Sequence, residues 1–275
     1  MSVINTNVSA LFAQNSMKTN ARAMSSAMEK LSTGSRINSA GDDAAGLAIG
    51  QTMTAQVRGL NMAVRNANDG INMMQTAEGA MVEQSNMLQR MRELAVQASN
   101  GTYSSTQRAY LQSEFDQLGS QITDISTDTT WNSLNLMDGT GSAGFTFQVG
   151  QNSGQTIAVE VADMSFASLA SGVTLGSAIS TASAAMTTIG ELDTALESVN
   201  SQRATIGAGI NRLTYAADNL TNISSNVSAS RSSVMDTDYA EASTQLSKTQ
   251  IIQQAATAML AQANQQPQSV LSLLK

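Results

Sequence analysis

A chain of 275 residues, with 14 basic and 21 acidic side chains, has room for one large or two small domains and carries a formal net charge of −7. That charge disfavours a nucleic-acid partner, because phosphate binding needs clustered Lys and Arg, and no apolar run approaches the roughly 18 residues that span a membrane. The chain contains no His and no Cys, which removes the commonest general base, the commonest zinc ligands and the thiol nucleophile, so we expect neither an enzyme nor a cofactor or metal site.

The N-terminal residues 1–33 predict a helix with few charges. Only 13% of all residues are charged and Pro267 is the single proline, a composition that permits long helices and surfaces that cost little to bury against another copy. The residues at heptad spacing in this segment are Met17, Ala21, Met24, Met28 and Leu31. An isolated helix of this kind is marginal in water.

Residues about 43–99 predict a long helix. Asp42 and Asp43 are suited to cap its positive end, and Asn100-Gly101 is suited to stop it. Its apolar stripe consists of Met53, Val57, Leu60, Val64, Ala67, Ile71 and Met74 and, after one skipped position, of Ala77, Met81, Leu88, Met91 and Ala95.

A shorter helix is expected over about 104–127, and after it the apolar period changes to two. The expected buried side of this helix consists of Tyr110, Leu111, Phe115, Leu118, Ile122 and Ile125. Apolar and polar residues then alternate over 145–149 and 157–161, on either side of Gln151–Gly154, which predicts a β-hairpin. The stretch from about 163 to 180 is rich in Ser, Ala and Gly and predicts an exposed loop or a small subdomain.

Residues about 180–231 predict a second long helix. Arg203 and Ser224 are the only polar residues on a seam that otherwise consists of Ile189, Leu192, Leu196, Val199, Ile206, Ile210, Leu213, Ala217, Leu220 and Val227. Such a seam needs a partner helix, which residues 43–99 supply.

The C-terminal residues 240–274 resemble the N-terminal segment in having few charges. Ile252, Ala256, Met259 and Ala263 fall on one helix face. Because ordering the backbone costs about 1–2 kcal/mol per residue, one interpretation is that both ends are disordered or loosely paired in the free chain and become ordered on assembly. The other is an ordinary antiparallel pair of terminal helices, and the residues alone favour neither.

These patterns together predict a mainly α fold, an elongated helical bundle or coiled coil with a small β-hairpin region, and the resemblance described next implies that the N- and C-terminal helices are paired. We expect a terminal assembly domain of residues 1–41 and 235–275. Residues 42–234 are expected to form a rod of three helices, about 43–99, 104–127 and 180–231, with the hairpin and loop region at about 140–178.

Several runs of the sequence carry a resemblance to a known family. They are Ile4–Asn7, Leu31–Ile49, Asn66–Ile71, Gln89–Gln97, Asn211–Leu213, Asp238–Ala240, Gln253–Ala255, Leu260–Asn264 and Val270–Leu274. In sequence and order they resemble bacterial flagellin. The chain departs from many relatives at Ser225–Ala229 and at Trp131, and it has no room for a large outer domain between residues 140 and 180.

The resemblance implies a secreted structural subunit that polymerises into the extracellular flagellar filament. It implies type III export, an export chaperone on the C-terminal segment, partner cap and hook–filament junction proteins, and terminal helices that pair around the inner tube. The residues it implies for assembly are Met17, Ala21, Met24, Met28, Leu31, Leu246, Ile252, Ala256, Met259, Ala263, Leu271 and Leu274.

The resemblance also extends to a surface that Toll-like receptor 5, an animal innate immune receptor, reads in many flagellins. The residues it implies here are Gln89, Arg90, Glu93, Leu94, Gln97 and Glu114. The alternative is that Arg90 and Glu93 form a solvated helix face and that Leu94 packs against the rod.

Three other functions compete with the filament subunit. The first is a hook–filament junction protein, and the second is a secreted protein or enzyme on a flagellin-like frame that does not assemble. The absence of His excludes a zinc protease from the second class. The third, a coiled-coil receptor fragment, is disfavoured by the lack of a membrane span.

Overall fold

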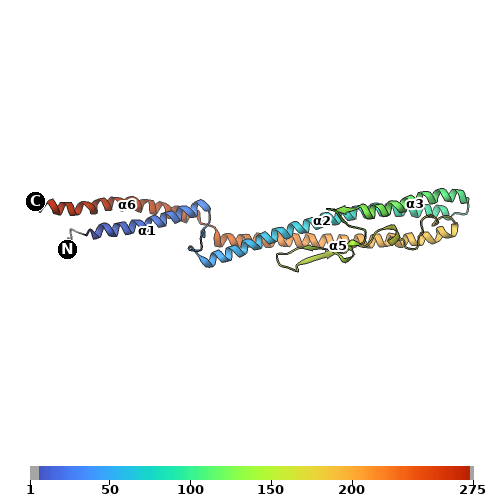
Figure 1. Cartoon of the computed structure of the whole chain (residues 1–275), viewed down its shortest axis with the longest axis horizontal. Coiled ribbons are helices and arrows are strands. Elements are labelled where there is room, and N and C mark those ends of the chain that lie inside the picture. The colour runs from blue at the N-terminus through green and yellow to red at the C-terminus, as the bar shows by residue number, and fades with distance from the viewer. Residues whose placement is uncertain (1–5, 273–275) are drawn as a thin grey trace. The chain divides into compact units, whose positions relative to one another are not determined.

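The computed structural model describes residues 6–272, and the side chains of residues 6–265. The predicted mainly α fold, with paired terminal helices and a small β region, is confirmed (Figure 1). In chain order the elements are α1 (Val8–Thr33), α2 (Ala44–Ser99), α3 (Ser105–Asp128), β1 (Thr130–Trp131), β2 (Leu134–Asn135), the 3-10 helix η1 (Thr140–Ala143), β3 (Phe145–Gln148), β4 (Thr156–Val159), α4 (Phe166–Leu169), α5 (Ala182–Met235) and α6 (Tyr239–Ser272).

The chain forms two compact units. The terminal unit comprises residues 1–57 and 225–275, and the central unit comprises residues 58–224. Within residues 6–272, no helix has an apolar stretch long enough to cross a membrane.

In the terminal unit, α1 and α6 lie side by side and run in opposite directions (Figure 1). Of the two interpretations of the chain ends, the structure therefore has the antiparallel helix pair. Gly34, whose left-handed φ of 70° costs a glycine no Cβ clash, ends α1. Beside it the backbone N–H of Arg36 donates to the carbonyl of Met235 (2.6 Å), and that of Thr237 donates to the carbonyl of Gly34 (3.0 Å), which ties the two connecting segments together.

Helix α2 begins and ends where the sequence predicts. The Asp43 carboxylate accepts a hydrogen bond from the backbone N–H of Gly46 (2.9 Å), which satisfies a free donor at the helix start. The Asp42 carboxylate accepts from the backbone N–H groups of Ser39 and Asn38, and these bonds lower its pKa. At the other end, the Arg108 guanidinium donates to the carbonyls of Ala98 (2.8 Å) and Asn100 (2.9 Å).

The core of the central unit lies along the predicted seams of α2 and α5. Met74, Met81, Leu88 and Met91 of α2 are fully buried, as are Leu192, Val199, Ile206 and Leu213 of α5. The two polar seam residues of α5 find partners on α2: Arg203 pairs with Glu78 (3.4 Å), and the Ser224 hydroxyl donates to Asn61 (2.9 Å). Burial of these apolar side chains is the main stabilising term for the unit.

Helix α3 begins with a capping box, in which Ser104 and Gln107 each accept a hydrogen bond from the other's backbone N–H. Its predicted buried side was wrong at Tyr110, which is exposed. The neighbouring Gln112 is buried instead, because its amide donates to Asp116 (2.7 Å) and accepts from the backbone N–H of Ile179 (2.7 Å). A polar side chain with both bonds satisfied can thus replace an apolar one in the core.

The predicted hairpin is present as the antiparallel pair of β3 and β4, with Phe147 opposite Ile157 and Phe145 opposite Val159. It packs against two glycines, because a Cβ on Gly70 would lie 2.9 Å from the Phe147 ring and one on Gly209 would lie 2.8 Å from a Val159 methyl. A second, shorter pair, β1 and β2, turns through residues 132 and 133, both with positive φ.

The segment after the hairpin is neither the exposed loop nor the separate small subdomain that was expected, because it packs on the core of the central unit. Met164, Phe166, Leu169 and Ile179 are buried in that core, and the short helix α4 begins at Phe166 and ends at Leu169. The Phe166 ring meets that of Phe115 edge to face, with centroids 6.4 Å apart. Four large apolar residues within a Ser- and Ala-rich stretch are enough to hold it on the bundle.

Candidate functional site

The α1–α6 pair is a coiled coil with an unusually small seam. On α1 the seam positions, each buried or half-buried, follow steps of three and four: Ala10, Ala13, Met17, Asn20, Met24, Ala27 and Leu31. On α6 they are Ala242, Leu246, Thr249, Gln253, Ala256, Leu260 and Ala263. Because six of these fourteen residues are Ala and three are polar, the pair buries little apolar area for its length.

Polar residues fix the register of this pair. The Asn20 amide, 9% exposed, donates to the carbonyl of Thr249 (2.8 Å) and to the Gln253 side chain (3.2 Å). A shift of α6 by one heptad would put Leu246 or Leu260 in the place of Gln253, so the Asn20 amide would lose its side-chain partner.

A second asparagine compensates for the proline in α6. Pro267 has no backbone N–H, so the carbonyl of Ala263, four residues earlier, lacks its usual helical donor. The Asn7 amide donates to that carbonyl (2.8 Å), while the Asn7 side-chain oxygen caps α1 by accepting from the N–H of Ala10 (3.0 Å). One residue thus satisfies free groups on both helices, and the sequence signal that could have located it is the single proline.

Outside the seam, the helix pair exposes several large apolar side chains. These are Val8, Leu11, Phe12 and Met28 on α1, and Ile251, Ile252 and Met259 on α6. Phe12 and Met259 have 75% and 68% of their surface exposed. No charged residue occurs in α1 before Lys18 or in α6 after Lys248. The distal part of the pair, residues 8–17 and 249–265, is therefore uncharged and exposes large apolar side chains among Ser, Thr, Asn and Gln. A surface of this kind is typical of a protein–protein contact.

Phe12 and Ile252 both line an open groove between α1 and α6 with a volume of about 550 Å³. Its other lining residues are small or polar, with Lys248 as the only charge. Met259 follows Ile252 by seven residues, so it lies on the same side of α6. The bonded pairs Asn7–Ala263 and Asn20–Thr249 place it about level with Phe12.

The residues predicted for assembly fall into three groups. Those in the seam are Met17, Met24, Leu31, Leu246, Ala256 and Ala263, and those exposed outside it are Ala21, Met28, Ile252 and Met259. The side chain of Leu271 and the whole of Leu274 lie outside the described residues. On α1, the predicted stripe contained both seam residues and exposed residues. The reason is that Asn20 occupies a seam position that was assigned to its neighbour Ala21.

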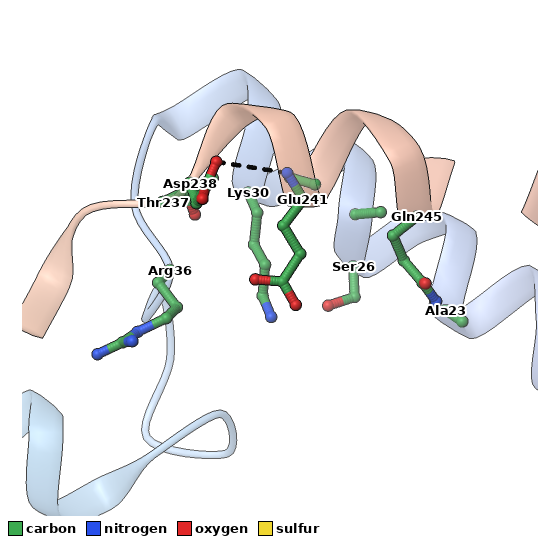
Figure 2. A pocket seen from close by; sticks show the side chains of 10 residues that line it. Ala23, Ser26, Lys30, Arg36, Thr237, Asp238, Glu241 and Gln245 are labelled. Atoms are coloured by element: carbon green, nitrogen blue, oxygen red, sulfur yellow. Dashed lines mark hydrogen bonds between the residues drawn. The ribbon is translucent and has the colours of Figure 1, made fainter. Parts of the chain in front are cut away.

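Near the Ser35–Asp236 bridge, a pocket of about 360 Å³ lies between α1 and α6 (Figure 2). Lys30 and Glu241 project into it from the two helices, and Arg36 and Asp238 flank it. Asp238 caps α6 by accepting from the N–H groups of Ala240 (2.8 Å) and Glu241 (3.4 Å), while Arg36 donates to the carbonyl of Val234 (2.6 Å). The pocket contains no Ser–Lys or carboxylate pair in hydrogen-bond contact that would suit nucleophilic or acid–base chemistry.

The residues predicted for receptor binding, called here the Arg90 surface, lie on α2 (Gln89, Arg90, Glu93, Leu94 and Gln97) and on α3 (Glu114) in the central unit. The Arg90 guanidinium contacts Glu114 (2.9 Å) and Glu93 (3.0 Å). Both bonds raise the pKa of Arg90, and the bond to Glu114 has the larger effect. Gln89 and Gln97 are exposed beside them, and the Gln97 amide donates to the Tyr103 hydroxyl (2.9 Å).

Leu94 differs from the other residues predicted for this surface. It is 1% exposed and belongs to the hydrophobic core. The structure therefore brings Gln89, Arg90, Glu93, Gln97 and Glu114 together on one exposed face and places Leu94 beneath it.

The chain matches two family models, "Bacterial flagellin N-terminal helical region" over residues 4–142 and "Bacterial flagellin C-terminal helical region" over residues 189–274. A flagellin of Halalkalibacterium halodurans is 44% identical over 273 residues, which cover 99% of this chain and 100% of the relative. A flagellin of Bacillus subtilis is 42% identical over 307 residues, with 99% of each chain covered. The crystal structure of a Bacillus cereus flagellin has a TM-score of 0.51 and 33% identity, covering 61% of this chain and 94% of that one.

Proposed function

The chain belongs to the bacterial flagellin family, and we propose that its α1–α6 pair drives its polymerisation into the flagellar filament. As a flagellin it is a structural subunit of the helical filament, and the family is structural rather than enzymatic. Filament growth by repeated, non-closing contacts requires each copy to offer surfaces that the next copy buries.

The observation that carries the proposal is the group of exposed large apolar side chains on the uncharged distal part of the helix pair. Burial of one Val-, Leu- or Met-sized side chain stabilises by about 1.5–3 kcal/mol. Full burial of Val8, Leu11, Phe12, Ile251, Ile252 and Met259 would thus contribute on the order of 10 kcal/mol, which is comparable with the cost of about 4–15 kcal/mol for immobilising a partner. Several neighbours per copy would then make assembly favourable.

We propose that two regions of the chain have different roles in the filament. Residues 1–41 and 235–275 form the assembly domain around the inner tube. Residues 42–234 form the rod of three helices with the hairpin region. The connecting segments at Gly34–Arg36 and Met235–Thr237, tied by backbone bonds, support a boundary at this position.

The test is electron microscopy of the full chain after seeding or salting-out. We expect long helical filaments from the full chain and none from a chain that lacks residues 1–33 and 240–275. A finer test replaces Phe12, Ile252 and Met259 by Ser. Its control replaces Met186 and Tyr215, which are equally exposed on the central unit.

Loss of filaments in the control but not in the Phe12 set would refute the proposed role of the helix pair. A full chain that stays monomeric under every seeding condition would favour the alternatives, a hook–filament junction protein or a secreted protein that does not assemble.

The family also supports proposals about partners and place. We propose an extracellular filament, an export chaperone that holds the C-terminal segment before secretion, and cap and hook–filament junction proteins as neighbours. The long α6 with its exposed Ile251, Ile252 and Met259 supports the chaperone proposal, since these side chains need cover before assembly. A chain truncated after residue 239 should lose the chaperone in a co-purification assay.

A second function that we propose is recognition by Toll-like receptor 5 through the exposed Arg90 surface. Its support is the side-by-side placement of Gln89, Arg90, Glu93, Gln97 and Glu114 on α2 and α3. Leu94 would act from beneath by fixing the position of α2. The test is receptor signalling by Arg90→Ala and Glu114→Ala, which we expect to be weaker while filaments still form.

Arg92 offers a matched control, because it is similarly exposed and also makes an ion pair, with Asp193 (2.6 Å). Arg92→Ala should signal like the unchanged chain. Equal receptor signalling by Arg90→Ala and Arg92→Ala would refute the proposed recognition by Toll-like receptor 5.

A further inference from the structure

The chain has sixteen methionines, and their exposure differs sharply. Met73, Met74, Met81, Met91, Met137 and Met164 are at most 4% exposed. Among the methionines that the structure describes, four are open to solvent: Met28 (54%) and Met259 (68%) in the terminal unit, and Met62 (47%) and Met186 (65%) in the central unit. The remaining described ones are half-buried.

An exposed thioether reacts with a hydroperoxide or a hypohalous acid. In the reaction with hydrogen peroxide, the sulfur lone pair attacks one peroxide oxygen, the O–O bond breaks, an S–O bond forms and water leaves. The sulfur is oxidised by two electrons and the peroxide is reduced. The product, methionine sulfoxide, is polar, and methionine sulfoxide reductases convert it back to the thioether.

The position of Met259 makes this chemistry consequential. It lies on the Ile252 side of α6 and about level with Phe12, within the apolar surface beside the α1–α6 groove. Met28 is exposed on α1, one residue after the buried Ala27. A sulfoxide at either position adds a strong hydrogen-bond acceptor to a surface that a second copy is to bury, and a buried acceptor without a donor is costly.

We propose that Met28 and Met259 are oxidation sites that control polymerisation. Oxidised monomers are assembly-incompetent, reduction restores them, and burial in the filament protects both thioethers. This inference rests on the proposed role of the α1–α6 pair. The core methionines take no part, because their sulfurs are shielded in the monomer as well.

The experiment treats full-length monomers with hydrogen peroxide at a dose that oxidises only the exposed methionines, as mapped by peptide mass spectrometry. Seeded polymerisation is then measured by sedimentation. We expect the critical concentration of the unchanged chain to rise by at least about tenfold, and a mixture of methionine sulfoxide reductases to reverse the rise.

Two matched double variants locate the effect. Met28→Leu with Met259→Leu keeps the apolar volume but cannot be oxidised, so its polymerisation should resist peroxide. Met62→Leu with Met186→Leu removes the same number of exposed thioethers from the central unit and should be as sensitive as the unchanged chain.

Normal polymerisation of the oxidised chain, or equal peroxide sensitivity of both variants, would overturn the inference while leaving the proposed function intact. Failure of the untreated chain to polymerise would overturn both. If the Met28–Met259 variant does not polymerise even untreated, sulfoxide mapping on preformed filaments decides: Met259 and Met28 must be protected relative to the monomer, and their unchanged oxidation would refute the proposal.

Discussion

Two glycines of α5, only two residues apart, should respond in opposite ways to replacement by alanine. A Cβ on Gly207 would meet nothing within 4 Å. A Cβ on Gly209 would lie 2.8 and 2.9 Å from the two methyl carbons of Val159. A comparison of the two variants therefore separates the stabilisation due to the helix propensity of alanine from the destabilisation due to a clash with the hairpin.

The magnitudes follow from the two environments. Gly207→Ala should raise the free energy of unfolding by about 0.5–1 kcal/mol, the usual difference in helix propensity. Gly209→Ala has the same gain but adds overpacking of about 1–3 kcal/mol, because Val159 is stiff, 3% exposed and held opposite Phe145 in the hairpin. The two variants should thus differ by about 1–3 kcal/mol.

Urea unfolding of the monomer, followed by fluorescence of Trp131, measures this difference. Trp131 is the only tryptophan and packs against the core of the central unit, so it reports the unit that contains both glycines. Equal shifts of the midpoint for Gly207→Ala and Gly209→Ala would refute the argument that Val159 needs a glycine at position 209.

Three further predictions concern the helix ends and an acidic turn. Asn7→Ala should destabilise the α1–α6 pair by about 1–2 kcal/mol in thermal melts followed by circular dichroism. The loss should be smaller in a Pro267→Ala background, because the Ala263 carbonyl regains a helical donor there. Equal losses in both backgrounds would contradict the compensation described for Asn7. Arg108→Ala should lower the free energy of unfolding of the central unit by about 1–2 kcal/mol, with partial recovery in Arg108→Lys, since the guanidinium donates to two carbonyls at the end of α2. Hydrogen bonds from Thr140, and secondarily from Asn135, lower the pKa of Asp138, so this carboxylate stabilises the folded chain above its unfolded pKa and ceases to do so as the pH falls below about 4. In a plot of the urea midpoint against pH, Asp138→Asn should therefore reduce the slope on the acid side. An unchanged slope would contradict this role of Asp138.

The sequence predicts the helices well because their signals are long. The α2 and α5 stripes repeat over many turns, so a single polar residue such as Arg203 does not obscure the period. The hairpin was also predictable, because apolar and polar residues alternate on both sides of one turn.

The candidate surfaces were less predictable, because a heptad pattern does not state which polar residues enter the seam. Asn20 is buried through bonds to α6 that lie 229 and 233 residues away in the chain, and no local pattern contains that information. Leu94 and Tyr110 illustrate the same limit. Which side of a helix faces its neighbour depends on the third helix and on the segment around Ile179, and these contacts arise only in the folded chain.

The α1–α6 pair also has a consequence for timing. Its bonds join residues separated by almost the whole chain, 208 between Leu31 and Tyr239 and 256 between Asn7 and Ala263. A ribosome therefore completes α1 long before it makes the residues that form the opposite side of the seam. Contacts of such high sequence separation form late, because the intervening loop must close first. The helix pair is thus absent until α6 has been made, and a chain that lacks α6 cannot present the surface that another copy would recognise.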